Sequence, residues 1–208
     1  NVTLVDVATI GNTATAIKNH IAAVYAAGNL AFVLLVGDYP EIQSASYAGG
    51  LSDPSYSTMT ADWYPDLFVG RFSAKTVAHV DTQVQRTLAY EQAPHDLSAG
   101  DWNAWGMGIA SDQGLGIGHY GEGDWQHEDL IRDELLAYGF TKVDQIYDPT
   151  GTKTMVKNAL NEGRRIVNYT GHGSSSAWGS TGFSSTDVAA LSNMGHLPFI
   201  CSVACVNG

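Results

Sequence analysis

A histidine and a cysteine, each placed just after an apolar run, carry the most specific chemistry in this sequence. Residues 166–169 lead into Gly-His-Gly-Ser with His172, and residues 197–204 lead into Cys-Val-Asn-Gly with Cys205. The pair is separated by 205 − 172 = 33 positions. Loops at the carboxyl ends of neighbouring parallel strands line one crevice of an open sheet. If both runs are strands, His172 and Cys205 therefore meet.

This pair fits nucleophilic catalysis. A thiol is mostly protonated near neutral pH, and an adjacent imidazole can take its proton or stabilise the thiolate. The backbone N–H groups of Gly173 and Cys205 could stabilise a developing oxyanion. Alone, each residue would be a core cysteine or a loop histidine. Together, on adjacent strand ends, they predict a cysteine peptidase.

Composition narrows the class of protein. The chain has 208 residues, 44% of them hydrophobic and 15% charged, which is typical of a folded globular protein. Its formal net charge of −11 argues against a nucleic-acid partner, since no basic stripe is present, and suits cation binding. No apolar run reaches the roughly 20 residues that a membrane span needs.

Strands and helices alternate along the sequence, which is the pattern of an α/β fold with mostly parallel sheets. The continuous apolar run 31–36 is typical of a strand buried on both faces. We expect strands over 2–7, 31–36, 66–72, 105–110, 142–147, 164–169 and 197–204, and helices over 14–27, 77–90, 124–138, 152–161 and 185–194.

Residues 93–100, rich in turn-forming types, are the best candidate for a linker. We therefore expect an N-terminal α/β subdomain over 1–100 and a catalytic one over 101–208. Cys201 and Cys205 are the two cysteines; on one extended strand their Cα atoms would lie about 13 Å apart, too far for a disulfide. Cys201 is then most simply a core residue.

The segments around the pair resemble the gingipains, which are secreted cysteine peptidases with a caspase-like fold. The similar residues are Asn-Tyr-Thr-Gly-His-Gly-Ser at 168–174 and Val-Ala-Cys-Val-Asn-Gly at 203–208, and the similarity extends along nearly the whole chain. It implies a catalytic His172, a nucleophilic Cys205 and two side-by-side α/β subdomains. The family's catalytic domain is longer at both ends, so further segments of the same polypeptide are expected as partners.

An acidic set could bind calcium, which prefers several carboxylate and carbonyl oxygens. Asp62 and Asp66 flank a short loop, and Asp38 follows a predicted strand. Spacing alone is equally consistent with a solvated acidic loop. The resemblance implies structural calcium, with ligands at Asp38, Met59, Asp62, Tyr64 and Asp66. The family has a longer acid where this chain has Asp66.

Asp124 opens a predicted helix, where an acid also serves as a cap. The resemblance implies that Asp124 receives the basic side chain of the substrate, as in arginine-specific gingipains. Glu122 and His127 lie where a second cation site could form.

A third carboxylate could orient the imidazole of His172, as in a catalytic triad. Aligned without gaps, the acidic residue of the family falls on Gln113, with Asp112 beside it. Either Asp112 takes the role after a one-residue shift, or Gln113 orients the ring as a neutral group. We favour Asp112.

The sequence thus predicts a secreted or cell-surface cysteine endopeptidase that cleaves proteins or peptides after basic residues, arginine first. Two different readings stay open beside it. One is an inactive or transpeptidase member on the same scaffold. The other is a zinc module, for which His172, His196, Cys201 and Cys205 would form a Cys₂His₂ site of irregular spacing.

Overall fold

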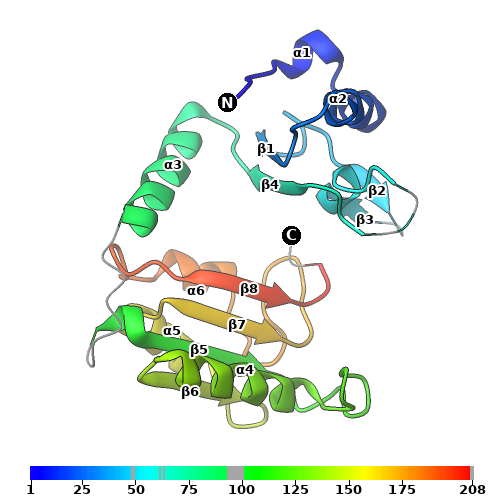
Figure 1. Ribbon diagram of the computed structural model, residues 1–208. Coiled ribbons are helices and arrows are strands. Elements are labelled where there is room, and N and C mark those ends of the chain that lie inside the picture. Colours follow the sequence, from blue (N-terminus) through cyan, green and yellow to red (C-terminus); the bar gives the residue numbers. More distant parts are fainter. Residues whose placement is uncertain (48–49, 61, 63, 93–100, 207–208) are drawn as a thin grey trace. The chain divides into compact units, whose positions relative to one another are not determined.

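The computed structural model describes residues 1–47, 50–60, 62, 64–92 and 101–206. The chain forms two compact units, Asn1–Leu88 and Ala89–Gly208, and each is described by itself. Figure 1 labels their elements along the chain. The predicted linker, 93–100, lies outside the described residues, so the predicted boundary at residue 100 stays a prediction.

The second unit contains a four-stranded sheet in which every neighbouring pair is parallel. Its order is β6-β5-β7-β8, so the chain moves first to one side of β5 and then to the other. The strands are β5 (Trp105–Ala110), β6 (Lys142–Tyr147), β7 (Ile166–Thr170) and β8 (Phe199–Val203), and a 3₁₀ turn, Trp102–Ala104, precedes them.

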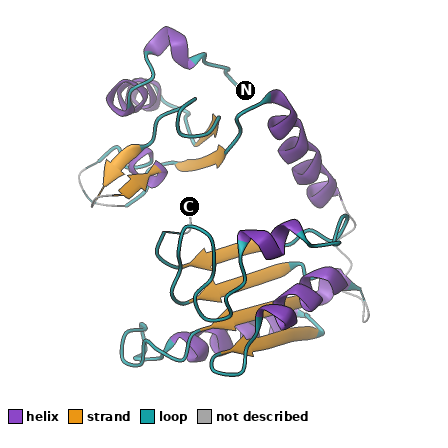
Figure 2. Ribbon diagram, turned by 180° about the vertical axis from the view of Figure 1, so that it is seen from behind, coloured by secondary structure: helices purple, strands orange, loops and turns teal. Residues whose placement is uncertain are grey.

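Helices cover both faces of this sheet. Helix α4 (Asp124–Tyr138) lies on one face, and α5 (Lys153–Glu162) and α6 (Ser185–Ala189) lie on the other, as the two opposite views show (Figures 1 and 2). The core on the α5 side is apolar; its buried residues are Met107, Ile109, Ile146, Val156, Ala159, Leu160, Val167, Tyr169 and Phe183. The predicted α/β class, with mostly parallel sheets, is confirmed.

Two glycines let α4 come close to the sheet. A Cβ at Gly106 would lie 3.6 Å from a methyl group of Leu135, and one at Gly108 would lie 3.0 Å from Oε2 of Glu128. The helix begins where Gln126 Oε1 accepts the Gly123 N–H at 2.9 Å. It ends at Gly139, whose φ of 121° favours glycine. The start of α4 thus lies beside the end of β5.

The first unit has a parallel pair, β1 (Phe32–Val36) with β4 (Phe68–Phe72), and a hairpin of β2 (Ala45–Tyr47) and β3 (Gly50–Ser52). Its helices are α1 (Val7–Ile10), α2 (Ala14–Ala26) and the start of α3 (Val77–Gln92), with a 3₁₀ turn at Asp53–Tyr56. Thr13 caps α2 by accepting the Ala16 N–H at 3.1 Å. The buried residues of its hydrophobic cluster are Ile17, Ile21, Leu35, Tyr56 and Leu67.

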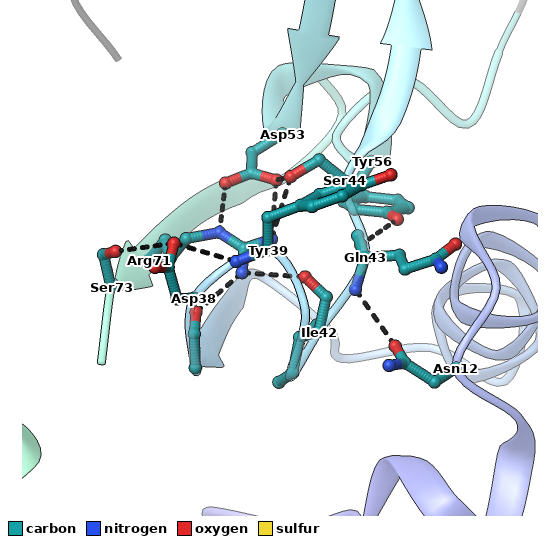
Figure 3. A network of polar contacts seen from close by, with 11 residues as sticks. Asn12, Asp38, Tyr39, Ile42, Gln43, Ser44, Asp53, Tyr56, Arg71 and Ser73 are labelled. Carbon is teal, nitrogen blue, oxygen red and sulfur yellow. Dashed lines mark hydrogen bonds and ion pairs between the residues drawn. The ribbon is translucent and has the colours of Figure 1, made fainter. Parts of the chain in front are cut away.

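A polar network at the carboxyl ends of β1 and β4 is centred on Arg71 (Figure 3). Its guanidinium donates to both carboxylate oxygens of Asp53, at 2.6 and 2.8 Å. It also donates to the carbonyl oxygens of Gly37 at 2.7 Å and Ile42 at 2.9 Å. Arg71 therefore ties three separate segments of this unit together.

Some elements differ from the sequence predictions. The strand predicted over 2–7 is wrong: the short helix α1 forms there instead, and Val2 and Leu4 pair with no strand among the described residues. Strand β1 is not buried on both faces, because Phe32, Leu34 and Val36 are exposed on one side. An apolar run indicates only that a strand can be buried. The elements packed against the strand determine whether one or both of its faces are covered.

The remaining predicted elements are present within a few residues of the expected bounds, except that α6 ends early, at Ala189. Cys201, expected in the core, is exposed on β8. The reason is that every residue of β8 is exposed, so neither face of this outer strand is covered by the described part of the chain. Within the described residues, no helix has the length and apolar character to cross a membrane.

Candidate active site

The register of β7 and β8 places the histidine and cysteine loops side by side. Thr170 pairs with Val203 at the carboxyl ends of the two strands. His172 lies 172 − 170 = 2 residues beyond this pair, and Cys205 lies 205 − 203 = 2 residues beyond it. The Gly171 N–H still donates to the Val203 carbonyl at 3.2 Å, so the chains remain adjacent past the ladder. The predicted juxtaposition at one sheet edge is therefore present.

Hydrogen bonds from Tyr169 and Gly179 fix the backbone at His172. Its carbonyl oxygen accepts a hydrogen bond from the buried Tyr169 hydroxyl and another from the Gly179 N–H, at 2.6 Å. A Cβ at Gly179 would lie 2.8 Å from that oxygen, so a larger residue does not fit. The Tyr169 ring stacks on Trp178 with centroids 4.8 Å apart. The loop after β7 is thus fixed to the core by its main chain, which leaves the imidazole exposed.

Gln113, not Asp112, contacts the imidazole. His172 Nε2 and Gln113 Oε1 are 2.9 Å apart. Asp112 lies instead near Asp148, whose pKa is raised by burial and by the Asp112 charge. The chain bends at Asp112, beyond the end of β5, and the two neighbouring side chains reach different partners. If Gln113 Oε1 accepts from Nε2–H, Nδ1 is the nitrogen left to act as a base.

The cysteine is positioned for access. Cys205 is exposed, and its thiol is free, as is that of Cys201. Val206, the next residue, has a φ of 59°, a left-handed conformation that is unusual for a β-branched side chain. The chain therefore turns sharply just after the thiol. A tight turn of this kind ends β8 and presents Cys205 at the sheet edge.

Asp124 lies beside the histidine contact. Ser111 Oγ donates to Asp124 Oδ2 at 2.5 Å, and the Asp124 N–H donates to the Gln113 carbonyl at 2.9 Å. The carboxylate is half-buried, at the first residue of α4, and Gly123 is the N-cap. The end of β5 and the start of α4 thus bring Asp124, Gln113 and His172 to one edge.

The predicted second cation site contains a contact between its two members. His127 Nδ1 lies 3.1 Å from Glu122 Oε1. Backbone hydrogen bonding, first of all its own N–H, lowers the pKa of Glu122. Among the residues that the structure describes, no group of three or more His, Cys, Asp or Glu side chains could hold a metal ion. Glu122 and His127 are thus in contact with each other, and a second cation site at this pair stays a prediction.

Part of the predicted calcium set does assemble. Thr60 Oγ1 lies 2.9 Å from Asp62 Oδ1 and 3.2 Å from Asp66 Oδ2, so one hydroxyl joins the two carboxylates. Backbone N–H groups of Thr60 and Met59 hydrogen-bond to Asp66 and lower its pKa. Two carboxylates in one loop are oxygen donors of the kind that a hard cation prefers. The carboxylates of Asp62 and Asp66 thus fit a calcium site, and the carbonyls of Met59 and Tyr64 stay predicted ligands.

Asp38 does not belong to that set, which corrects the prediction. It follows β1, where it accepts from Ser73 Oγ at 3.1 Å and pairs with Lys75 at 3.4 Å. Asp66 precedes β4, and the parallel register places it at the opposite end of the strands. The ladder between these ends spans about 13 Å, whereas two oxygens on one calcium ion lie within about 5 Å of each other. Asp38 and Asp66 cannot share one ion in this arrangement.

The zinc hypothesis is contradicted by the topology. The His196 ring lies against Trp102 in a tilted arrangement, with ring centroids 5.1 Å apart, at the amino end of the sheet. His172 and Cys205 lie at the carboxyl end of the same strands. The four residues therefore cannot converge on one metal ion.

One buried acid beside the site was missed. Glu128 is 1% exposed; its Oε1 accepts from Thr170 Oγ1 at 2.8 Å, and Oε2 has no hydrogen-bond partner in the described part of the chain. Burial raises the pKa of Glu128 to about 7. An available signal was its position one helical turn after Asp124, on the face toward Gly108. Glu128 connects α4 to the strand end that leads to His172.

The chain is similar to known peptidases over nearly its whole length. Gingipain R2 and gingipain R1 of Porphyromonas gingivalis are each 40% identical to it over 200 residues, 94% of this chain and 27% and 20% of theirs. Lys-gingipain of the same organism is 27% identical over 204 residues. This chain therefore spans about a quarter of the length of the curated relatives it matches first.

Solved structures give the same result. The crystal structure of the Arg-specific cysteine proteinase gingipain R matches with a TM-score of 0.89 and 39% identity, over 97% of this chain and 47% of that one. A complex of the pro- and mature domains of a Porphyromonas gingivalis gingipain, RgpB, matches with a TM-score of 0.87 and 40% identity, over 94% and 47%. The fold is thus the predicted caspase-like one. The model of peptidase family C25 matches residues 1–208, and the chain belongs to that family.

Proposed function

We propose that this chain carries the catalytic pair of a cysteine endopeptidase that cleaves after arginine. The observation that supports this most is the register of β7 and β8, with His172 and Cys205 each two residues past the pair Thr170–Val203. Membership of a peptidase family supports the reaction class.

In the proposed mechanism, the Cys205 sulfur attacks the carbonyl carbon of the scissile peptide bond. His172 takes the thiol proton and later donates a proton to the leaving amine, so that an acyl-enzyme forms and the C–N bond breaks. The N–H groups of Gly173 and Cys205 stabilise the oxyanion. Water then attacks the thioester, His172 removes its proton, and Cys205 is regenerated. Gln113 holds the ring as a neutral partner.

Arginine preference rests on Asp124. Its carboxylate lies beside the Gln113–His172 contact and is held by Ser111. A carboxylate pairs with a guanidinium through two parallel hydrogen bonds, a geometry that a lysine ammonium cannot match. The relatives at 40% identity are named gingipain R, and the lysine-named relatives reach 27%.

The test is Asp124→Asn. Asparagine keeps the size and one acceptor for Ser111, so thermal stability should change little. Cleavage after arginine should fall by about a hundredfold or more, because the charged partner of the guanidinium is lost. Cleavage after neutral residues should be unaffected. Equal activity of the variant on arginine peptides would show that Asp124 serves only the helix start.

A thiol-directed active-site probe distinguishes an active peptidase from an inactive member of the family. An active enzyme should be labelled at Cys205 and not at Cys201, although both thiols are exposed. Mass spectrometry of the labelled peptide identifies the site. No labelling at Cys205 would favour an inactive member. Product analysis with an added amine acceptor separates hydrolysis from transpeptidation.

We further propose that calcium binds at the loop of Asp62 and Asp66, with carbonyl oxygens of Met59 and Tyr64. Bound there, calcium would neutralise adjacent carboxylates and stabilise the loop; it has no role in the peptidase reaction. A ligand that binds only the folded state stabilises it by about 2.7 kcal/mol at a hundredfold excess over Kd. Melting should therefore shift upward with calcium and downward with chelator, and Asp62→Asn should abolish the shift. Loss of the shift in Asp38→Asn instead would contradict this assignment.

Secretion is also part of the proposal, since it rests on the resemblance to the gingipains. The expected partners of the protein are protein or peptide substrates and further segments of the same polypeptide.

Secretion is tested by detecting the protein with an antibody in the culture medium, in washed cells and in the cell lysate. Protein found only in the lysate would overturn the proposal of secretion.

A further inference from the structure

We propose that the loop between β5 and α4 forms an apolar subsite, which binds an apolar substrate side chain next to the basic residue held by Asp124. This inference rests on the proposed function and adds a second determinant of substrate choice. The subsite consists of the side chains of Leu115, Ile117 and Tyr120.

The first observation is exposure. Leu115, Ile117 and Tyr120 are 78%, 84% and 82% exposed, within six residues of one loop. Single exposed apolar residues are normal, but a local group of large ones on a soluble protein marks a surface that binds something. The burial of each such side chain by a ligand is favourable, so the loop gains free energy when an apolar group covers it.

The second observation is that the loop is held in shape by its own backbone hydrogen bonds. The loop closes on itself through backbone hydrogen bonds, from Gly116 N–H to Gly121 O at 2.9 Å and from Gly118 N–H to Glu122 O at 3.0 Å. The Ile117 N–H donates to the Gly114 carbonyl at 2.9 Å. A loop already held in this way loses little conformational entropy on binding. The apolar side chains are therefore presented on a preformed support.

The third observation is position. The loop starts at Gln113, which contacts His172, and ends at Asp124, and the Asp124 N–H to Gln113 O bond joins its two ends. A Cβ at Gly114 would lie 2.6 Å from Asp124 Oδ1, and one at Gly123 would lie 3.3 Å from the Leu115 nitrogen. Leu115 is thus next to the carboxylate that we assign to arginine. The residues that flank an arginine bound at Asp124 would therefore be within reach of this loop.

The occupant follows from this geometry. Asp124 holds the arginine side chain of the peptide. The substrate residues next to that arginine then lie close to Leu115. An apolar side chain at one of these neighbouring positions would cover the loop. We therefore assign the subsite to a residue flanking the arginine in the substrate.

The experiment compares arginine peptides that carry leucine or serine at each of the two positions before the arginine and the one after it. For the parent protein, kcat/KM should be about tenfold higher with leucine at one position. In the double variant Leu115→Ser, Ile117→Ser this preference should vanish, while the serine peptides are cleaved at the parent rate. Tyr138→Ser is the control, because Tyr138 is also exposed but lies at the far end of α4.

The outcomes separate this inference from the proposed function. If the parent protein cleaves arginine peptides without regard to leucine at any of the three positions, the subsite is overturned and the function stands. An equal fall on leucine and serine peptides in the double variant, at unchanged melting temperature, also overturns it. If no arginine peptide is cleaved at all, the proposed function itself fails.

Discussion

The carboxyl ends of the parallel strands differ between the two units. After β1 and β4, Arg71 donates to Asp53 and to the carbonyls of Gly37 and Ile42, so the polar groups there pair with one another. After β5, β7 and β8, the corresponding edge presents an exposed thiol and an imidazole held by an amide contact.

The difference shows how one type of strand end serves two purposes. Mutually paired polar groups stabilise a fold but have no capacity left for a ligand. Groups with few partners contribute less stability and keep their hydrogen-bonding and nucleophilic capacity for a substrate. We therefore expect substitutions at the carboxyl ends of β1 and β4 to change stability. Substitutions at the carboxyl ends of β5, β7 and β8 should change activity.

The largest expected effect is that of Cys205→Ala. Peptidase activity should fall by at least about a thousandfold, because the nucleophile is removed. Thermal melting should be unchanged, since the thiol is exposed. The measurement is hydrolysis of an arginine peptide. Cys201→Ala is the matched control; loss of activity in that variant at unchanged stability would reverse the assignment.

Arg71→Met should give the opposite result, a loss of stability. Removal of one partner of a buried ion pair costs about 3–5 kcal/mol, and the lower end applies because Asp53 is partly exposed. Arg71 hydrogen bonding lowers the pKa of Asp53 from 3.8, so the pair stabilises fully above that pH and less as pH falls through the lowered pKa.

The measurement for Arg71→Met is denaturant unfolding at pH 7 and at progressively lower pH. The difference from the parent protein should shrink in acid as Asp53 is protonated. Arg86→Met, on the exposed side of α3, is the control. An equal effect of the two substitutions at pH 7 would contradict the special role of Arg71.

Glu128 provides a contrast to Asp53, because the pKa of Glu128 is raised whereas that of Asp53 is lowered. Burial raises this pKa from 4.5 to about 7, so the folded state holds a proton that the unfolded state releases. Stability is therefore greatest below about pH 4.5 and falls as pH rises to about 7. Glu128→Gln removes this fall and should be relatively more stable at pH 8, by about 2–3 kcal/mol.

Unfolding free energies at pH 4 and pH 8 test the role of Glu128. Glu134→Gln, on the exposed side of the same helix, should leave the pH dependence as it is. If the two variants show the same dependence, Glu128 is ionised in the folded state.

The smallest expected effect is that of Gln113→Ala, about a tenfold fall in kcat with little change in KM, because the ring of His172 loses its orienting contact. Gln113→Glu should retain activity, since a carboxylate also accepts from the ring. Asp112→Ala is the control and should behave like the parent protein. If Asp112→Ala causes the larger fall, the contact seen in the structure is not the one used in catalysis.

Sequence alone predicted most of the elements and the proximity of the loops that carry His172 and Cys205. The strands at 105–110 and 142–147 and the helix at 124–138 have the predicted bounds, because apolar periodicity and the glycine after the helix are local signals. His172 and Cys205 could be paired in advance because parallel strands bring their carboxyl ends to one edge whatever their separation along the chain. The family followed from the motifs around them.

Tertiary structure decided what depends on register and burial. It placed Gln113 rather than Asp112 on His172, because the chain bends at Asp112 beyond β5 and the two side chains reach different partners. It separated Asp38 from Asp66, because parallel pairing puts them at opposite strand ends. It exposed Cys201 and buried Glu128, because the neighbours of a strand or helix, and not its own residue types, determine which of its faces are covered.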